Sequence, residues 1–218
     1  MGCFCLLFEV AEVLATQLGQ SRLIQELIIF ILGTNKNFKK ELGRFISFSK
    51  IKEIHDIGGS DGELLEYLSL KNKKYFCYDI DLVNINKAKQ KYKSKKNIKF
   101  FNQSIDKIKI NKYKRKLFVL SGVFHHLNDL QIQDFVSKLS YKHSVIAIDP
   151  FFHQNQNIIG YILKRLDKGK YIRNLETYKS VLKNFKFKKK IKKYLRFYSH
   201  LISYKNIESK KIKKFFDY

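Results

Sequence analysis

The sequence is poor in several residues that mark particular classes of protein. Its 218 residues include one proline, no tryptophan and three cysteines. Cys3 and Cys5 lie near the first residue and only Cys77 lies further on, so the thiols cannot form a disulfide framework, and their spacing fits no zinc site. We therefore expect a reducing, cytoplasmic location and no metal requirement.

A long hydrophobic run is also missing. No apolar stretch reaches the roughly 18 residues that a membrane-spanning helix needs, so we expect no such helix. The apolar stretch near the start lacks a basic leader and runs into Glu9 and Glu12, which argues against a secretory signal. Two interpretations remain for the charge-poor first 34 residues: packing onto the core, which is the simpler, or contact with a membrane surface.

Acidic residues are scarce compared with basic ones. Lys and Arg number 44 and Asp and Glu number 19, which gives a net charge of +25. This excess could attract nucleic acid or anionic lipid, or it could follow from a nucleotide-composition bias of the source genome. The stretch 183–196 has eight basic residues interleaved with aromatics and no acid. It could bind RNA, although a solvated edge strand is the simpler interpretation.

Hydrophobic residues make up 44% of the chain, enough for a sizeable core, and their periodicity alternates between strand and helix. Strands are predicted at 51–57, 74–79, 98–101, 117–121 and 144–149, followed by a hairpin of strands at 187–196 and 199–205. Helices are predicted at 8–18, 21–32, 36–48, 63–69, 82–93, 130–139 and 175–184. Alternation of this kind favours a doubly wound, mostly parallel α/β sheet of seven strands with helices on both faces and a C-terminal antiparallel hairpin. We expect residues 1–48 to form a helical extension, able to act as a lid, and residues 49–218 to form one domain.

A glycine-rich turn follows the first predicted strand. Gly58, Gly59 and Gly62 lie where the chain passes from strand to helix, and Asp56 precedes them. Glycine suits a sharp turn and a close approach of ligand to backbone, and the following helix start adds partial positive charge. Because Asp56 would repel a pyrophosphate, the turn favours a ligand that carries a cationic group.

This segment resembles motif I, Asp-x-Gly-x-Gly-x-Gly, of the class I, Rossmann-like S-adenosylmethionine (SAM)-dependent methyltransferases of the small-molecule type. Asp56, Gly58 and Gly62 match the motif, and Ser60 stands at its middle glycine. Four further blocks are similar to family motifs and follow in the expected order. They are 78–81 at the end of the second strand, 121–129 after the fourth strand, 147–150 at the end of the fifth, and 166–173 beyond it.

The resemblance implies SAM as the cofactor and assigns roles around it. Asp79 would bind the ribose hydroxyls, and Ser104 stands where the family often has an acid that meets the adenine. The implied cofactor-binding residues are Asp56, Gly58, Gly59, Ser60, Gly62, Asp79, Ser104 and Ser121. Asp56 would lie near the ammonium group of the methionyl part, directly or through water.

Acceptor-side residues follow from the later blocks. His125 or His126 could act as a general base, or one of them could pack beneath the loop. Tyr171 and Arg173 could bind an anionic group of the acceptor, or Arg173 could form a salt bridge to Asp167 or Glu176 that closes a helix–loop junction.

We therefore predict methyl transfer from SAM to a small-molecule acceptor by in-line displacement. One alternative is an RNA methyltransferase that uses the basic 183–196 face. A second is a non-catalytic subunit of the same fold, because Ser104 and Lys116 stand where the family carries acids.

Overall fold

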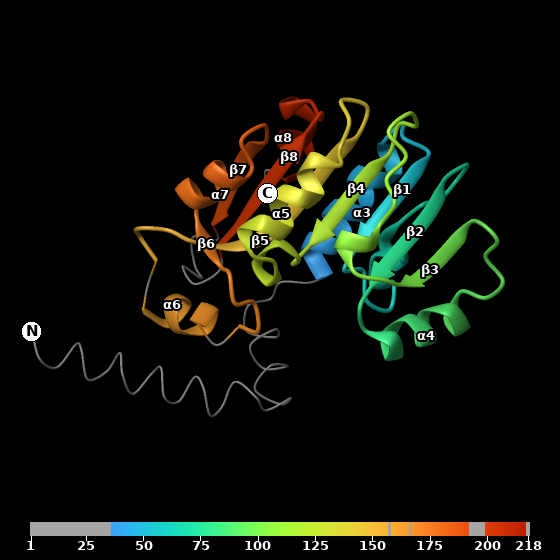
Figure 1. Ribbon diagram of the computed structural model, residues 1–218, viewed down its shortest axis with the longest axis horizontal. Helices are drawn as coiled ribbons and strands as arrows, with labels where there is room; N and C mark the ends of the chain where they lie inside the picture. The colour runs from blue at the N-terminus through green and yellow to red at the C-terminus, as the bar shows by residue number, and fades with distance from the viewer. Residues whose placement is uncertain (1–35, 157, 166, 192–198, 217–218) are drawn as a thin grey trace, which may run out of the picture.

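A computed structural model describes residues 36–216 apart from 157, 166 and 192–198 (Figure 1). The described chain forms one eight-stranded sheet in the order β3-β2-β1-β4-β5-β8-β7, and β6 pairs with β5 off this path. The strands are β1 (Glu53–Ile57), β2 (Lys74–Asp79), β3 (Ile98–Asn102), β4 (Leu117–Ser121), β5 (Ser144–Phe152), β6 (Arg173–Asn174), β7 (Lys186–Ile191) and β8 (Ser199–Lys205). The α-helices are α3 (Lys36–Phe48), α4 (Leu82–Lys91), α5 (Asp129–Ser137), α6 (Ile158–Arg165), α7 (Leu175–Val181) and α8 (Ser209–Phe216), and the 3₁₀ helices are η1 (Glu63–Tyr67), η2 (Ile105–Lys107) and η3 (Phe124–His126).

Strand β1 lies at the centre of the sheet. It pairs in parallel with β2 on one side and with β4 on the other, so the chain reverses its direction of travel across the sheet between these strands. Ligands of doubly wound sheets bind beside such a reversal, at the carboxyl ends of the strands. The predicted architecture is confirmed, including the antiparallel pairing of β7 with β8, and the two-residue β6 makes the sheet one strand larger than expected.

Side chains that alternate along each strand build two cores. Along β4, Leu117 and Val119 belong to the core covered by α3 and α8, while Phe118 and Leu120 belong to the core covered by α5 and α7. The two layers of helices bury both faces of the central strands, which explains why β4 is apolar from Leu117 to Leu120.

Helix α3 has the predicted bounds and is part of the first core. Its Phe38 and Leu42 pack in the same cluster as Phe216 of α8. On another side of α3, a Cβ placed on Gly43 would lie 2.4 Å from the carbonyl oxygen of Tyr67 in η1, so the two helices cross closely. Residues 36–48 therefore belong to the main core, and the predicted helices 8–18 and 21–32 lie outside the described residues.

Several elements differ from the predicted ones. The expected helix at 63–69 is the short η1, and α6, α8 and the 3₁₀ helices η2 and η3 were not expected. Strand β5 continues to Phe152, beyond its predicted end at residue 149 and through Pro150. Pro150 is tolerated because β4 already ends at Ser121, opposite Ile148, so no β4 carbonyl lies opposite the missing N–H. Among the described residues, no helix is both long and apolar enough to cross a membrane.

Candidate functional site

The glycine-rich turn at 58–62 lies at the carboxyl edge of the sheet and is held by the end of β2. The N–H of Gly58 donates to the carbonyl oxygen of Tyr78 at 2.7 Å, and the N–H of Ser60 donates to Asp79 Oδ2 at 2.8 Å. The other oxygen of Asp79 accepts the N–H of Asp81 at 2.9 Å. A carboxylate offers about four acceptor positions, so Asp79 retains room for further donors.

The glycines of the turn are needed by the protein's own packing. Gly58 and Gly62 have φ values of 68° and 79°, which favour glycine. A Cβ on Gly58 would lie 2.7 Å from Val123, one on Gly62 would lie 3.0 Å from Phe100, and one on Gly59 would lie 2.6 Å from both an Asp56 oxygen and the Cys77 sulfur. The fold alone accounts for these residues, and cofactor contact by the same turn stays a prediction.

Ser60 shows how the departure from motif I is accommodated. It adopts a left-handed conformation with φ of 51°, although a side chain there is unfavourable. Besides its backbone bond to Asp79, its Oγ accepts a hydrogen bond from Asn84 Nδ2 at 2.9 Å. These two bonds, one from each side of the residue, hold the serine in a position that suits glycine.

Asp56 lies beneath the turn, where Tyr75 donates a hydrogen bond to its Oδ2. Burial raises the pKa of Asp56 to about 7, against the opposing effects of the Tyr75 hydrogen bond and of Lys39. The predicted direct contact of Asp56 with a cationic ligand is therefore not supported, because the carboxyl group is buried and accepts the hydrogen bond of Tyr75. Asp56 acts as a buried support of the turn.

Ser104 and Ser121 also lie at the carboxyl edge, where they were expected. Ser104 follows β3, and its hydroxyl donates to Asp106, so an acid stands two residues after the family position and beside it. Ser121 is the last residue of β4 and pairs with Ile148 of β5. Their roles toward a cofactor stay predictions.

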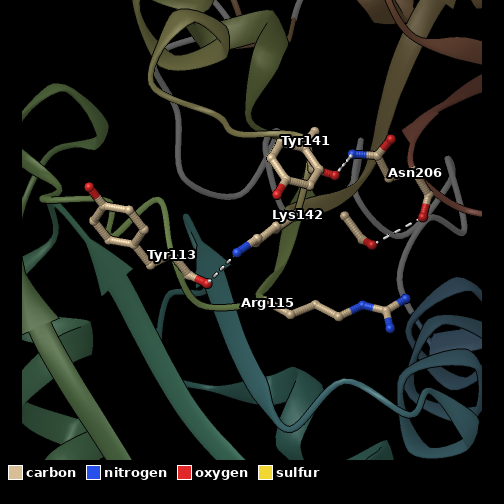
Figure 2. A pocket seen from close by; sticks show the side chains of 6 residues that line it. Tyr113, Arg115, Tyr141, Lys142 and Asn206 are labelled. Atoms are coloured by element: carbon tan, nitrogen blue, oxygen red, sulfur yellow. Dashed lines mark hydrogen bonds between the residues drawn. The ribbon is translucent and has the colours of Figure 1, made fainter.

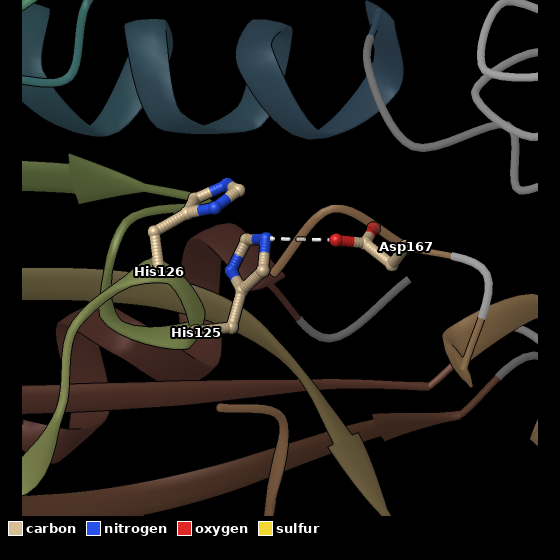
Figure 3. A group of neighbouring side chains, drawn as sticks. All are labelled: His125, His126 and Asp167. Carbon is tan, nitrogen blue, oxygen red and sulfur yellow. Dashed lines mark ion pairs between the residues drawn. The ribbon is translucent and has the colours of Figure 1, made fainter. Parts of the chain in front are cut away.

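His125 lies between two carboxylates. Its Nδ1 donates to Asp149 Oδ1 at 2.9 Å, and its Nε2 lies 3.4 Å from Asp167 Oδ1 (Figure 3). Burial disfavours the charged ring, but the hydrogen bonds to Asp149 and Asp167 outweigh it and raise the pKa of His125 to about 9. A general base needs a free lone pair, so the charged His125 is not a base at neutral pH.

His126 is exposed at the end of η3, and its ring centroid lies 4.1 Å from that of His125. Partial desolvation and the neighbouring His125 cation lower the pKa of His126. Its imidazole is thus neutral near pH 7. Of the two histidines, His126 is therefore the one for which the role of general base stays a prediction.

The segment 167–173 is fastened over His125. The N–H of Tyr171 donates to the His125 carbonyl oxygen at 2.9 Å, and Gly169 N donates to Asp167 Oδ1 at 2.7 Å. A Cβ on Gly169 would lie 1.9 Å from the His125 ring, so only glycine fits there. The Tyr171 side chain is 40% exposed, and its predicted contact with an acceptor is sterically open.

Arg173 is buried, and the protein uses all five of its N–H groups. Nε and Nη2 donate to Asp129 Oδ1 at 2.8 and 2.6 Å. The remaining donors reach the carbonyl oxygens of Phe124, Tyr171 and Leu127 at 2.7–2.9 Å. A guanidinium has five donors, so none is left for an acceptor, and the prediction that Arg173 binds substrate is wrong. The alternative of a salt bridge that closes this junction is confirmed, but its partner is Asp129 and not Asp167 or Glu176.

Lys164 was not expected because α6 was not predicted. Its Nζ donates to the Phe151 carbonyl at 2.7 Å, to Gln156 Oε1 at 2.8 Å and to Ser199 Oγ. Burial lowers the pKa of Lys164 to about 7. Because an ammonium group has three hydrogens and each has a partner, Lys164 ties α6 to β5 and β8 rather than facing a ligand.

The family comparison bears on this arrangement directly. Residues 54–149, from β1 to β5, match the family described as "Methyltransferase domain". These residues belong to the methyltransferase domain family. The match covers the turn at 58–62, Asp79 and both histidines, so the recognition made from these motifs is confirmed.

Solved structures with the fold of class I methyltransferases resemble the chain, at low sequence identity. Human N-acetylserotonin methyltransferase in complex with SAM is 16% identical with a TM-score of 0.57, covering 76% of this chain and 51% of its own. NcsB1, an O-methyltransferase from neocarzinostatin biosynthesis, is 15% identical with a TM-score of 0.55, covering 76% and 53%. The N-methyltransferase NodS from Bradyrhizobium japonicum is 15% identical with a TM-score of 0.54, covering 77% and 92%. The chain thus spans about half the length of the first two proteins, and no curated protein matches it significantly.

The methyltransferase domain departs from its family at Lys116, at the start of β4. The buried Lys116 Nζ lies 2.9 Å from Glu53 Oε1, and Glu53 also contacts His55 Nε2 at 2.9 Å. This ion pair lies at the amino ends of β1 and β4, away from the turn at 58–62. The missing acid therefore does not remove a group from the candidate cofactor edge.

The same amino edge of the methyltransferase domain carries an open pocket of about 320 Å³ (Figure 2). Arg115 and Lys142 line it together with two exposed tyrosine rings, Tyr113 and Tyr141. It lies where β4 and β5 begin, so it is separate from the site at the carboxyl edge.

Asp56→Asn should alter how stability depends on pH. An unfolded aspartate titrates near pH 4, so between about pH 4 and 7 the folded protein holds a proton that unfolding releases. The wild-type free energy of unfolding should therefore fall as pH rises through this range. Asparagine does not titrate, so the free energy of unfolding of the variant, relative to that of the wild type, should rise by on the order of 1–3 kcal/mol from pH 5 to pH 8. Thermal unfolding at the two pH values measures this change. A stability difference that is the same at both pH values would show that Asp56 is ionised in the fold.

Arg173→Lys should destabilise the protein by roughly 2–3 kcal/mol, because lysine cannot form the fork that joins Asp129 to three carbonyl groups. Denaturant unfolding measures this loss. Lys179→Arg, on the exposed face of α7, is the control and should change stability little. An Arg173→Lys protein as stable as the control would contradict the assigned role.

Proposed function

We propose that the chain is a SAM-dependent methyltransferase that acts on a small molecule. The observation that carries the proposal is the turn at 58–62, held at the carboxyl edge by Tyr78 and Asp79 inside a methyltransferase domain. The NcsB1 structure, which has the same fold, holds S-adenosylhomocysteine and 1,4-dihydroxy-2-naphthoic acid, so an acceptor of this size is compatible with the fold.

In this proposal the methionyl part of SAM lies against the turn, and the ribose hydroxyls donate to the free acceptor positions of Asp79. Ser104 follows β3 and Ser121 ends β4, the strands that flank β2 and β1 in the sheet. In this proposal the two serines border the adenosine. Asp56 does not contact SAM in this proposal. It lies beneath the turn, where it packs against Gly59 and accepts the hydrogen bond of Tyr75 from β2.

The sulfonium of SAM is already reactive, so the domain mainly has to align the acceptor atom, methyl carbon and sulfur. Alignment of this kind can supply roughly 7–11 kcal/mol of barrier lowering. An acceptor that keeps its proton near neutral pH needs a base, and His126 is the neutral imidazole in place. Tyr171 is the proposed contact on the acceptor side, and the residues before α3 are the proposed lid. The proposed location is the cytoplasm, in keeping with the low cysteine content and the free, buried thiol of Cys77.

Neither alternative gains support from the family match or from the similar structures. Part of the basic 183–196 stretch is used within the protein, since Lys190 contacts Glu41 at 2.5 Å and lies 4.5 Å from the centroid of the Phe38 ring. The non-catalytic alternative was based on the absence of acids at Ser104 and Lys116. Each of these residues contacts a nearby acid in the structure, Asp106 beside Ser104 and Glu53 beside Lys116.

Calorimetry with SAM tests the cofactor site. Asp79→Ala should weaken SAM binding by about 1–3 kcal/mol, because hydrogen bonds to a charged acceptor are lost and the turn loses its tether. Asp134→Ala is the matched control: it removes one exposed carboxylate from α5, away from the turn, and should leave SAM affinity unchanged. Equal affinities for both variants and the wild type would reduce Asp79 to a structural role.

Transfer of an isotope-labelled methyl group tests the acceptor class. The protein is incubated with labelled SAM and, separately, with a panel of small hydroxyl and amine compounds or with cellular RNA. The proposal expects label in small molecules. Label in RNA alone would favour the RNA alternative, and an absence of SAM binding would favour the non-catalytic one.

A further inference from the structure

Three potential metal ligands meet on the acceptor side of the candidate site. His125 and His126 come from η3, and Asp167 follows α6, some forty residues later in the chain (Figure 3). One nitrogen of each imidazole and one carboxylate oxygen all lie within 4.8 Å of one another. No spacing pattern in the sequence marks this group, because only the fold brings the two segments together.

The separations suit a small tetrahedral ion. His125 Nε2 lies 3.4 Å from Asp167 Oδ1. In a tetrahedral zinc site with bonds of about 2.0–2.1 Å, two ligand atoms lie about 3.3–3.4 Å apart. This pair is therefore already spaced as two ligands of one ion. The third ligand atom, on the exposed His126 ring, lies within 4.8 Å of both and has to move closer to complete the set.

A second observation points to the same use of His125. The buried Asp149 accepts a hydrogen bond from His125 Nδ1 at 2.9 Å and also from the His125 backbone N–H at 3.2 Å. This contact fixes the ring so that Nε2 faces Asp167. Metal-binding histidines almost always have such a carboxylate or carbonyl on their other nitrogen.

We propose that His125, His126 and Asp167 bind a divalent transition-metal ion of the zinc type. The ion takes the place of the proton that His125 Nε2 otherwise carries, so binding releases this proton and weakens as the pH falls. Two imidazoles and one carboxylate favour such ions over Mg²⁺ and Ca²⁺, which prefer oxygen ligands alone. Three protein ligands leave one position open, as in sites where an ion acts on a substrate rather than on the fold.

The use of the ion rests on the proposed methyl transfer, whereas its binding does not. With the ion present, an acceptor hydroxyl at the open position becomes more acidic and gives its proton to bulk water. Its oxygen then forms the bond to the methyl carbon as the carbon–sulfur bond of SAM breaks and leaves a neutral thioether. His126 is a ligand in this state, and no imidazole base is needed.

Cobalt titration of the full chain tests the proposal. Protein stripped with a chelator is titrated with Co²⁺, whose visible absorption reports its ligands, and Zn²⁺ is then added as a competitor. We expect one Co²⁺ per chain with a dissociation constant near or below about 1 µM, displaced by Zn²⁺. Asp149→Asn should weaken binding about 10–100-fold through the His125 ring, and Asp167→Asn and His126→Ala should weaken it at least as much.

Asp134→Asn is the matched control for Asp167→Asn, because it removes one carboxylate from the exposed face of α5. It should bind Co²⁺ like the wild type. A cooperative thermal unfolding transition of every variant checks that each one is folded. The proposal is overturned if the folded wild type gives no Co²⁺ absorption, or if Asp167→Asn and Asp134→Asn bind Co²⁺ equally. A wild type that binds Co²⁺ but not SAM would contradict the proposed methyl transfer and leave the metal site standing.

Discussion

The carboxylate of Asp79 and the carbonyl of Tyr78 hold the turn between β1 and η1 against the end of β2. Through them, one strand end fixes the backbone of Gly58, Ser60 and Asp81 at once. This tether determines where the turn lies relative to the carboxyl edge, and it also starts α4. The glycines then follow from packing, since Val123, Asp56 and Phe100 occupy the space where side chains would stand.

The acceptor side is held by a different kind of contact. Charged groups with all their donors satisfied, the Arg173 guanidinium and the His125 imidazolium, join the segment 167–173 to η3 and to the start of α5. Removing one partner of such a buried network costs more than the pair contributes on its own, because unsatisfied groups remain. The segment 167–173 is therefore held in place beside His126 before any ligand binds. The side chain of Tyr171, on this segment, is partly exposed and can contact a ligand.

The central part of the fold could be predicted because alternation and glycine positions are local signals. Strands β2, β4 and β8 have the predicted bounds, and Asp79 was placed at its strand end by the resemblance of residues 78–81 to a family motif. The partners of Arg173 could not be predicted, since Asp129 lies 44 residues away and only the docked segment brings them together. The surroundings of Asp56 could not be predicted because its partner, Tyr75, lies on the neighbouring strand β2. Tyr75 donates a hydrogen bond to the buried Asp56, which had been predicted to lie near the ligand. Lys164 was missed because α6 was not predicted, although its eight residues are amphipathic.

A crystal structure of the chain with S-adenosylhomocysteine tests the central claim most directly. The account predicts that the methionyl part lies against residues 58–62 and that the ribose hydroxyls reach Asp79, while Asp56 keeps its bond to Tyr75. A ligand bound elsewhere on the sheet, or one seated at the turn without any contact to Asp79, would contradict it.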